Sequence, residues 1–334
     1  MNAHAPSSQK QTGAALISVL LLFALITILT AQLISQTQSG IERTRWLVSD
    51  AQAYQYALGG EILARQILWQ QHQDLKAEGI SISPVPQALP IYQPEYGEIA
   101  IEIVDLQGQL NLNNAIGSDT QKASLTRLFG TLLLKPELAQ VLGDWVDADN
   151  TPLPGGAEDS AYLSLTPPYR TADRKINSSS ELLALKGIDA ELLSEIMPWL
   201  TALPEPTAIN PNTASAEILS LLIPGLSGEQ VLNFRETNPP GFLSVSEFLA
   251  ADISAGLEIN PELLTVSSRY YGLKIRASIN DRNSWLSSII SIDTETSELT
   301  LQKRTLGKTS EFNHTDLFKT EQAEQNDTET ISLH

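Results

Sequence analysis

The chain has 334 residues, of which 42% are hydrophobic, and a formal net charge of -18 from 39 acidic and 21 basic residues. Nucleic-acid affinity comes mainly from neutralising phosphates with lysine and arginine, so this charge argues against a nucleic-acid partner and favours cations and basic protein surfaces. The absence of cysteine excludes disulfides, thiolate zinc sites and a cysteine nucleophile.

An apolar segment near the start, from Gly13 to Gln36, has no charged residue between Lys10 and Glu42. Its apolar core of about twenty residues is long enough for an α-helix to cross a bilayer. A cleaved secretory signal has a shorter apolar run followed by a small-x-small site, so a membrane anchor fits better. The charges flanking the segment leave its orientation undecided.

Gly13 directly precedes the apolar run, behind a short polar leader. This junction resembles the cleavage site of type IV prepilins, and the resemblance implies cutting by a prepilin peptidase after Gly13 and methylation of Ala14. Prepilins usually carry a glutamate five residues after the cut, whereas this chain has Ser18. A plain signal anchor is the alternative interpretation.

The helix is expected to continue beyond the bilayer, because no proline occurs from Ile41 to about Gln71. Tyr54, Leu58 and Ile62 recur at helical spacing and form an amphipathic face. That face serves the chain's own sheet, a partner protein or both; we favour packing within the chain and retain the three residues as candidate partner contacts.

The segment DAQAYQYALGGEILARQIL, which begins at Asp50, resembles the K-type minor pseudopilins of type II secretion systems. After a proline-punctuated loop from Ser83 to Pro94, alternating isoleucines around Ile101 predict a half-buried strand. Strand patterns return only near the C-terminus, in LTVSSRYYGLKIRASI, SWLSSIISID and ELTLQKRTL. The chain is therefore expected to be α+β, with a long N-terminal helix on an antiparallel sheet and a large inserted α-helical domain.

Two helices are predicted at the start of the inserted region, in KASLTRLFGTL and PELAQVLGDWV, and an acidic loop follows them from Gly143. Clustered carboxylates repel one another, and calcium relieves that repulsion with six to eight oxygen ligands. The spacing is not that of an EF-hand, because Thr151 and Pro152 stand where a ligand and a glycine are required. The candidate ligands are Asp144, Asp147, Asp149, Asn150, Glu158 and Asp159. A solvated acidic loop without metal is the alternative.

The same loop resembles the K-type pseudopilin pattern of an Asp-Trp opening, a Gly-Gly-Ala-Glu segment and a Pro-Pro-Tyr that here ends at Tyr169. The resemblance implies calcium in this domain. Two helical units follow, from Ile176 and from Ile209, each with a polar cap, a short helix, a glycine-centred hairpin and a second helix.

The second unit resembles helix-hairpin-helix modules of membrane-anchored DNA receptors, which is the main rival interpretation. Between Asn177 and Asp252, however, ten acidic residues face only Lys186 and Arg235. Such a surface repels a duplex. We therefore interpret the units as protein-contact modules.

The order of these features identifies the chain as resembling a K-type minor pseudopilin, a structural subunit rather than an enzyme. The resemblance implies a leader (1–13), a membrane helix (14–36), an amphipathic helix and first strand (37–110), an inserted helical domain (111–260) and C-terminal strands (261–308). The tail (309–334) is polar and lacks periodicity, so it is expected to be disordered.

The resemblance also implies a function and a location. The subunit would cap the pseudopilus tip, assist its assembly and support export of folded proteins from the periplasm across the outer membrane. It would cross the inner membrane once, with its C-terminal domain in the periplasm. Its partners would be the I- and J-type minor pseudopilins, the major pseudopilin, the prepilin peptidase and the inner-membrane secretion platform.

Overall fold

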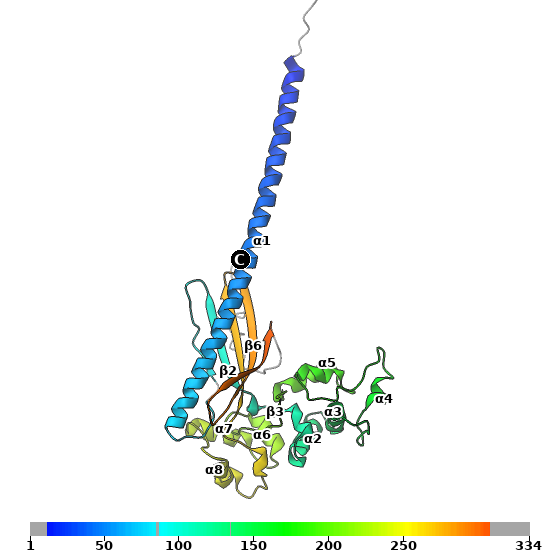
Figure 1. Cartoon of the computed structure of the whole chain (residues 1–334), viewed down its shortest axis with the longest axis vertical. Helices are drawn as coiled ribbons and strands as arrows, with labels where there is room; N and C mark the ends of the chain where they lie inside the picture. Colours follow the sequence, from blue (N-terminus) through cyan, green and yellow to red (C-terminus); the bar gives the residue numbers. More distant parts are fainter. Residues whose placement is uncertain (1–11, 85–86, 134, 308–334) are drawn as a thin grey trace, which may run out of the picture.

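One helix dominates the architecture. The computed structural model describes residues 12–84, 87–133 and 135–307. Helix α1 (Thr12–Ala77) is continuous over 66 residues, and its N-terminal half projects far out of the folded head (Figure 1). The prediction of a single helix through both the apolar and the amphipathic segment is confirmed, and the helix ends at Ala77 rather than near Gln71. The predicted leader and tail lie largely outside the described residues.

Five antiparallel strands form the main sheet, in the order β1-β2-β5-β6-β7. The predicted strand near Ile101 and the three predicted C-terminal strands are confirmed. Strand β2 pairs with β5, although the whole inserted region lies between these two strands in the sequence, and Ile101 stands opposite Ile275. The strands are β1 (Gln87–Ala88), β2 (Glu98–Asp105), β5 (Tyr270–Ile279), β6 (Arg282–Ile292) and β7 (Leu299–Leu306).

Strand β1 corrects the expectation that the segment from Ser83 to Pro94 is only a loop. It pairs with β2 at Ile103 and Glu102. Two residues are too short to produce an alternating pattern, so the sequence gives no periodic signal for it.

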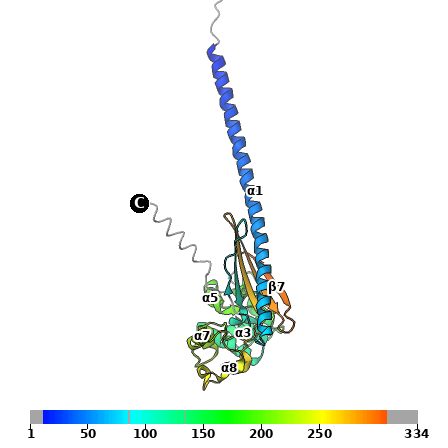
Figure 2. The ribbon, with the colours of Figure 1, turned by 90° about the vertical axis from the view of Figure 1, so that its left-hand side faces the viewer.

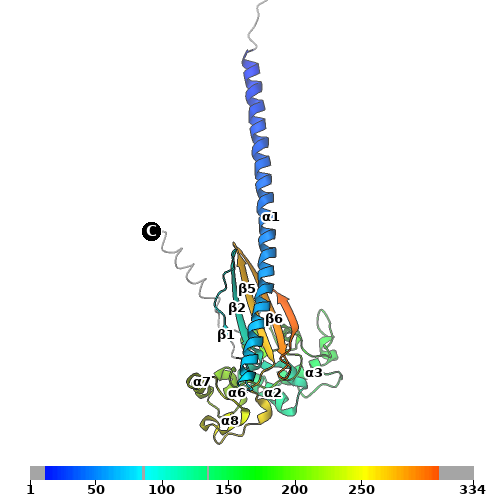
Figure 3. The ribbon, with the colours of Figure 1, turned by 60° about the vertical axis from the view of Figure 1, so that its left-hand side comes forward.

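Helix α1 lies across one face of this sheet (Figure 3) and contributes small side chains to the contact. Ala53, Ala57 and Ala64 are completely buried there, together with Leu68. A Cβ at Gly60 would lie only 2.8–2.9 Å from the side chains of Ile275 and Ile99. The helix axis therefore approaches the sheet more closely than larger side chains would allow.

This packing corrects the expectation that Tyr54, Leu58 and Ile62 form the main contact with the sheet. Tyr54 and Leu58 are half-buried at the edge of the contact, and Ile62 is 67% exposed. The alanine face lies beside the predicted face on the helical circle. Helical spacing correctly predicted an amphipathic helix, but it pointed to the larger apolar residues as the packing face. Because α1 lies so close to the sheet, the alanines are buried there instead.

An ion pair with a buried carboxylate joins the same helix to the edge of the sheet. Glu61 is 1% exposed, and both its oxygens accept hydrogen bonds from Arg304 of β7 at 2.7 Å. Ser288 of β6 donates a further bond at 2.8 Å. Burial alone would raise the pKa of Glu61, but these hydrogen bonds outweigh it and hold the pKa below its ordinary value.

The inserted region lies at the end of the head opposite the projecting half of α1 (Figures 1 and 2). It has its own hydrophobic core, separate from the core between α1 and the sheet. Its α-helices are α2 (Asp119–Leu133), α3 (Leu138–Val146), α4 (Asp159–Tyr162), α5 (Ala190–Ile196), α6 (Ala216–Leu222), α7 (Gly228–Thr237) and α8 (Val245–Ala250).

The inserted region is not purely α-helical, which corrects one detail of the expectation. It contains 3-10 turns and a parallel pair of two-residue strands, β3 (Leu110–Asn111) and β4 (Leu200–Thr201). The two predicted helical units are present, with left-handed glycines in their hairpins at Gly187 (φ +89°) and Gly225 (φ +86°). The first unit starts with a 3-10 helix over Ser179–Ala184 instead of an α-helix.

A buried carboxylate fixes the insertion to the sheet where the chain leaves β2. Asp105 accepts hydrogen bonds from the backbone N–H of Gln107 (2.8 Å), the amide of Asn210 (3.0 Å), and the hydroxyls of Thr213 (2.8 Å) and Ser268 (2.7 Å). These donors come from the start of the insertion, from its second helical unit and from the segment before β5. The network therefore holds together the points where the chain enters and leaves the inserted region.

Replacing Arg304 by alanine should lower the free energy of unfolding by about 2–3 kcal/mol, because it leaves the Glu61 carboxylate buried without its cation. The value is below the roughly 3–5 kcal/mol typical of a fully buried pair, since the Arg304 side chain is 36% exposed and its charge is partly screened. Chemical denaturation of the full-length chain in detergent measures the loss.

The exposed neighbour Gln302 provides a control, and Gln302→Ala should cost under about 0.5 kcal/mol. Because the folded-state pKa of Glu61 is lowered, the stabilisation from its pair is present at neutral pH and declines as the pH falls through that pKa. Equal losses for Arg304→Ala and Gln302→Ala would show that the pair does not stabilise the contact between α1 and β7.

Candidate metal centre

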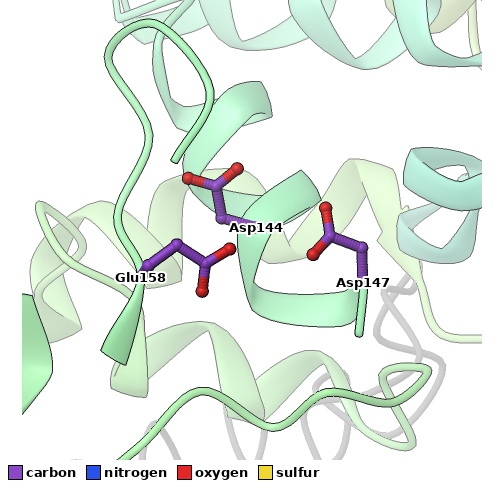
Figure 4. Close-up of side chains that lie close together, drawn as sticks. All are labelled: Asp144, Asp147 and Glu158. Carbon is purple, nitrogen blue, oxygen red and sulfur yellow. The ribbon is translucent and has the colours of Figure 1, made fainter. Parts of the chain in front are cut away.

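Three acidic side chains from two ends of one loop converge in the insertion (Figure 4). Asp144 lies in the last turn of α3, Asp147 caps its C-terminus, and Glu158 immediately precedes α4. One carboxylate oxygen from each lies within 4.8 Å of the others. Asp144 and Asp147 are three residues apart and so lie on the same side of the helix end. The loop between α3 and α4 folds back toward α3 and brings Glu158 beside them.

The loop is closed over Asp144 by its own backbone. The N–H of Leu153 donates to both Asp144 oxygens, at 3.1 and 3.2 Å. Gly155 adopts φ +87°, a left-handed conformation that favours glycine. At Gly156 a Cβ would overlap the Asp144 carboxylate. The Gly-Gly pair is therefore required for the loop to pass this close to the carboxylate.

Several oxygens of the cluster have no hydrogen-bond donor. Among the described residues, neither carboxylate oxygen of Glu158 has a partner, and Oδ1 of Asp147 also has none. Glu158 is only 3% exposed, and Asp144 is completely buried. Buried oxygens without donors are costly, so this arrangement requires either protons or a cation.

The proton affinities agree with that requirement. Burial, followed by the nearby charges of Asp144, Asp147, Asp149 and Asp173, raises the pKa of Glu158 to about 7. Burial also raises the pKa of Asp144 and of Asp147, and the charge of Asp149 raises both further. A divalent cation placed among these groups would reverse the effect of their mutual repulsion.

The donor set fits calcium. Carboxylate oxygens are the ligands that calcium prefers, and three side chains that bind through one or both oxygens supply three to six of its usual six to eight ligands, with backbone carbonyls and water available for the rest. Three carboxylates without histidine or thiolate are less suited to zinc.

The structure does not bring all six predicted ligands together. Asp149 and Asn150 are exposed, and Asp149 accepts a hydrogen bond from the N–H of Thr151 at 2.7 Å. Asp159 turns away from the cluster to pair with Arg170 and to accept bonds from Thr171. Although burial acts to raise its pKa, these contacts hold the pKa of Asp159 below its ordinary value. The adjacent residues Glu158 and Asp159 therefore have different roles. Glu158 belongs to the carboxylate cluster, and Asp159 bonds to the later part of the loop at Arg170 and Thr171.

Asp173 is a further acidic residue of this loop and is not among the six predicted ligands. Its charge raises the pKa of Asp147 and of Glu158, and its N–H donates to the carbonyl of Trp145 at 3.2 Å. The signal available in the sequence was its position a few residues after the Pro-Pro-Tyr motif. Asp173 lies close to Asp147 and Glu158 only because the chain folds back onto α3 at this point.

Aromatic residues of the same motifs pack beside the cluster. The rings of Trp145 and Tyr162 meet edge to face with centroids 5.2 Å apart, and Tyr169 lies 5.3 Å from Tyr162. The Tyr169 hydroxyl donates to the carbonyl of Ala184 in the first helical unit. The Asp-Trp and Pro-Pro-Tyr motifs therefore join the acidic loop to that unit.

Of the three predicted partner residues, only Ile62 lines an open groove beside α1. A groove of about 540 Å³ is bounded by Ile62, Arg65, Gln66 and Trp69 of α1 and by Ser297, Glu298 and Leu299 at the start of β7. Ile62 is 67% exposed and Trp69 38% exposed. Tyr54 and Leu58 lie outside this groove, so the structure separates the three predicted residues.

The second helical unit lacks the features of a DNA-binding hairpin. Arg235, its one basic residue, donates to the backbone carbonyls of Pro211 (3.1 Å) and Ala214 (2.7 Å). Glu229 stands exposed in the first turn of α7, where a phosphate would approach. Nothing in this geometry favours the DNA-receptor interpretation.

The predicted processing residues Gly13 and Ala14 lie in the first turn of α1. Within the described residues, α1 is the single helix long and apolar enough to cross a membrane, and none of its most apolar stretch is covered by the rest of the chain. The structure does not test cleavage at Gly13, which stays a prediction.

Two family models of the type II secretion system protein K match the chain, at residues 108–205 and 209–267. These matches cover the acidic loop and both helical units.

Among curated relatives, the type II secretion system protein K of Pseudomonas aeruginosa is 34% identical over 301 residues, covering 84% of this chain and 88% of the relative. The protein of the same name from Klebsiella pneumoniae is 32% identical over 263 residues, covering 73% and 80%. A chain in the crystal structure of the GspK-GspI-GspJ complex from the type 2 secretion system of enterotoxigenic Escherichia coli has the same fold, with a TM-score of 0.66 and 24% identity. That match covers 80% of this chain and all of the other.

Removing the ionisation of Glu158 should change how stability depends on pH when metal is chelated. The folded-state pKa of about 7 lies above the ordinary value of 4.5, so the folded chain retains a proton that the unfolded chain loses in this range. The contribution of Glu158 to stability is therefore greatest below pH 4.5 and falls as the pH rises to about 7.

We expect the melting temperature of Glu158→Gln, relative to that of the unsubstituted chain, to increase steadily from the lower to the upper end of this range in the presence of EDTA. Glu229→Gln, which removes an exposed carboxylate far from the loop, should show no such trend. A difference for Glu158→Gln that stays constant with pH would contradict the assignment of the raised pKa.

Proposed function

The chain belongs to the type II secretion system protein K family, and from this we propose that it is a structural minor pseudopilin that caps the tip of the secretion pseudopilus. In this role it assists assembly of the filament and export of folded proteins from the periplasm across the outer membrane. We propose a structural role without catalysis, in keeping with relatives that are named as components of the secretion system.

One observation carries the tip assignment: the inserted region occupies the end of the head opposite the projecting half of α1 (Figures 1 and 2). Pilin-like subunits stack with their N-terminal helices inside the filament and their heads outside. A subunit placed above this one would meet the insertion, whereas a terminal position leaves that space free. The bulk of the insertion therefore supports a position at the end of the filament.

We propose the I- and J-type minor pseudopilins as direct partners, because the related fold was solved in a complex whose name contains both. The groove beside α1 that contains Ile62 and Trp69 is the proposed contact, since it combines exposed apolar side chains with Arg65 and Glu298 at its border. The major pseudopilin and the inner-membrane secretion platform are proposed as further partners during assembly.

We propose calcium as the ligand of Asp144, Asp147 and Glu158. The support is the set of buried oxygens without donors and the raised pKa values, which a dication would neutralise together. When bound, calcium would supply structural cross-linking of the two ends of the loop. The chain's own residues close the loop by the bonds from Leu153 to Asp144 and by the close passage of Gly156.

We further propose that α1 crosses the inner membrane once, that the head lies in the periplasm, and that a prepilin peptidase cuts after Gly13 to leave a methylated Ala14. The apolar character of α1 around this junction supports the proposal.

Co-expression with the I- and J-type subunits of the same secretion system tests the proposed function. The full-length chain should co-purify with both subunits, and Ile62→Asp should strongly reduce the recovered amounts because it places a charge in the apolar groove. Gln55→Asp, at an exposed position on the same helix, is the matched control and should leave recovery unchanged. Failure of the unsubstituted chain to retain either subunit would contradict the proposed role.

Calcium should raise the melting temperature of the full-length chain in detergent, because a ligand that binds only the folded state stabilises it by about 2.7 kcal/mol at a hundred times its Kd. Asp147→Asn and Glu158→Gln should abolish most of the shift, while Glu229→Gln should retain it. Magnesium should act more weakly, since it requires a stricter octahedral geometry. No shift at millimolar calcium would exclude the proposed metal site.

Replacement of Gly13 by leucine should block cleavage in cells that contain the peptidase, because a bulky side chain at the cut site prevents backbone access. Mass spectrometry of the purified chain gives the N-terminus directly. Glycine at 13 should yield a chain starting at methylated Ala14, and Gly13→Leu should yield a chain that retains the leader. A start at Ala14 in both would disprove the assignment.

A further inference from the structure

The uncharged part of α1 is longer than its apolar segment. After Gln36, no charged residue occurs until Glu42, which is followed by Arg43, Arg45 and Trp46. At 1.5 Å per residue the helix from Ala14 to Trp46 is about 48 Å long. A bilayer with its headgroups is about 40–45 Å thick. A helix tilted by about 20–30°, within the range of membrane helices, thus reaches from one surface to the other over these residues.

The hydroxyl groups of this stretch are compatible with burial in lipid. Five of them donate to the backbone carbonyl four residues earlier in α1, namely those of Thr27, Thr30, Thr37, Ser39 and Thr44. Such bonds satisfy the hydroxyl protons within the helix, so these side chains need no water. The hydroxyl groups of Thr37 and Ser39 therefore do not by themselves place the segment that follows Gln36 outside the membrane.

Three exposed apolar residues follow the first charges. Trp46 is 57% exposed, Leu47 63% and Val48 50%, although they lie immediately beside the folded head. Tryptophan with flanking arginine is typical of the headgroup level of a membrane, where an amphipathic ring and a cation both find suitable surroundings. We refer to Trp46, Leu47 and Val48 as the collar.

The head begins one residue after the collar. Ser49 is buried and accepts a hydrogen bond from Asn280 at 3.0 Å, and Asp50 pairs with Arg282 at 2.7 and 3.0 Å. Asn280 lies in the turn between β5 and β6, and Arg282 is the first residue of β6 after that turn. This turn therefore fixes the membrane-side end of the sheet at the level of the collar. Tyr96, which is 65% exposed, lines a shared surface hollow with Asn280.

We propose that, before assembly, α1 sits deep enough for the collar to lie among the lipid headgroups, so that the membrane-side end of the head rests on the bilayer surface. The ligand of this surface is the lipid bilayer. The inference rests on the proposed anchoring of α1 in the membrane and adds the depth at which the subunit is held. Extraction into a filament then requires removal of Trp46 from the interface as well as removal of the apolar segment.

The interaction is apolar rather than ionic. Around the collar and the adjoining turn, Arg43, Arg45 and Arg282 are balanced by Glu42, Asp50 and Asp281. A neutral balance gives no net attraction to anionic lipids. Binding of the collar is thus expected to be insensitive to salt and to the fraction of anionic lipid.

The absence of cysteine allows a direct depth measurement, because one introduced thiol gives a single labelling site. The full-length chain is placed in phosphatidylcholine nanodiscs with an environment-sensitive dye at Leu47→Cys. Leu25→Cys marks the membrane interior, and Ser246→Cys marks the exposed surface of α8. Each dye is quenched by lipids that carry a nitroxide either at the headgroup or deep in the acyl chain.

The dye at position 47 should lose most of its fluorescence with the headgroup nitroxide, and the dye at position 246 should lose none. Adding Trp46→Ser to Leu47→Cys should markedly reduce that quenching, whereas adding Gln55→Ser should not. Replacing part of the phosphatidylcholine by phosphatidylglycerol should change neither result. A dye at position 47 quenched no more than the dye at 246 would overturn the proposal, and so would quenching that depends on anionic lipid.

The position 25 dye separates this inference from the proposed function. If that dye is quenched by the deep nitroxide and the position 47 dye is unquenched, the membrane anchor holds and the collar inference alone fails. If the position 25 dye is also unquenched, the anchoring itself is wrong. Retention of the I- and J-type subunits is measured separately and is independent of both outcomes.

Discussion

The close approach of α1 to the sheet is the constraint on which the rest of the structure depends. Alanines at 53, 57 and 64, with Gly60, let the helix lie directly on Ile99 and Ile275. The same helix is the proposed membrane anchor, so this contact joins the head rigidly to the segment that enters a filament. Larger side chains would lift the helix off the sheet and separate Glu61 from Arg304.

The insertion depends on this frame through the network around Asp105, whose four donors come from the start of the insertion, from its second helical unit and from the segment before β5. Its own core then positions the acidic loop. Several carboxylate oxygens of this loop have no hydrogen-bond donor. Asp144 and Asp147 are held together by the C-terminal end of α3, and loop folding places Glu158 beside them. The insertion therefore gives one end of the subunit a separate core and a cluster of carboxylates.

Regular patterns in the sequence predicted the continuous helix, β2 and the three C-terminal strands, because each has many residues in one period. They did not predict which helix face packs: Ile62 looks more suited to a core than Ala57, yet the close approach buries the alanine. Among six predicted ligands, Glu158 and Asp159 are neighbours that loop closure sends to different partners. Such choices depend on tertiary distances, which spacing along the chain does not encode.

A subunit that caps the pseudopilus is found at the end of the filament and not along its shaft. Gold labelling of a tag in the exposed tip of the acidic loop, at Thr151, tests this directly in pseudopili sheared from cells that express the tagged chain. The account predicts label at a single end of each filament and none along its length. Label repeated along the shaft would contradict it, because the insertion would then have to fit between stacked heads.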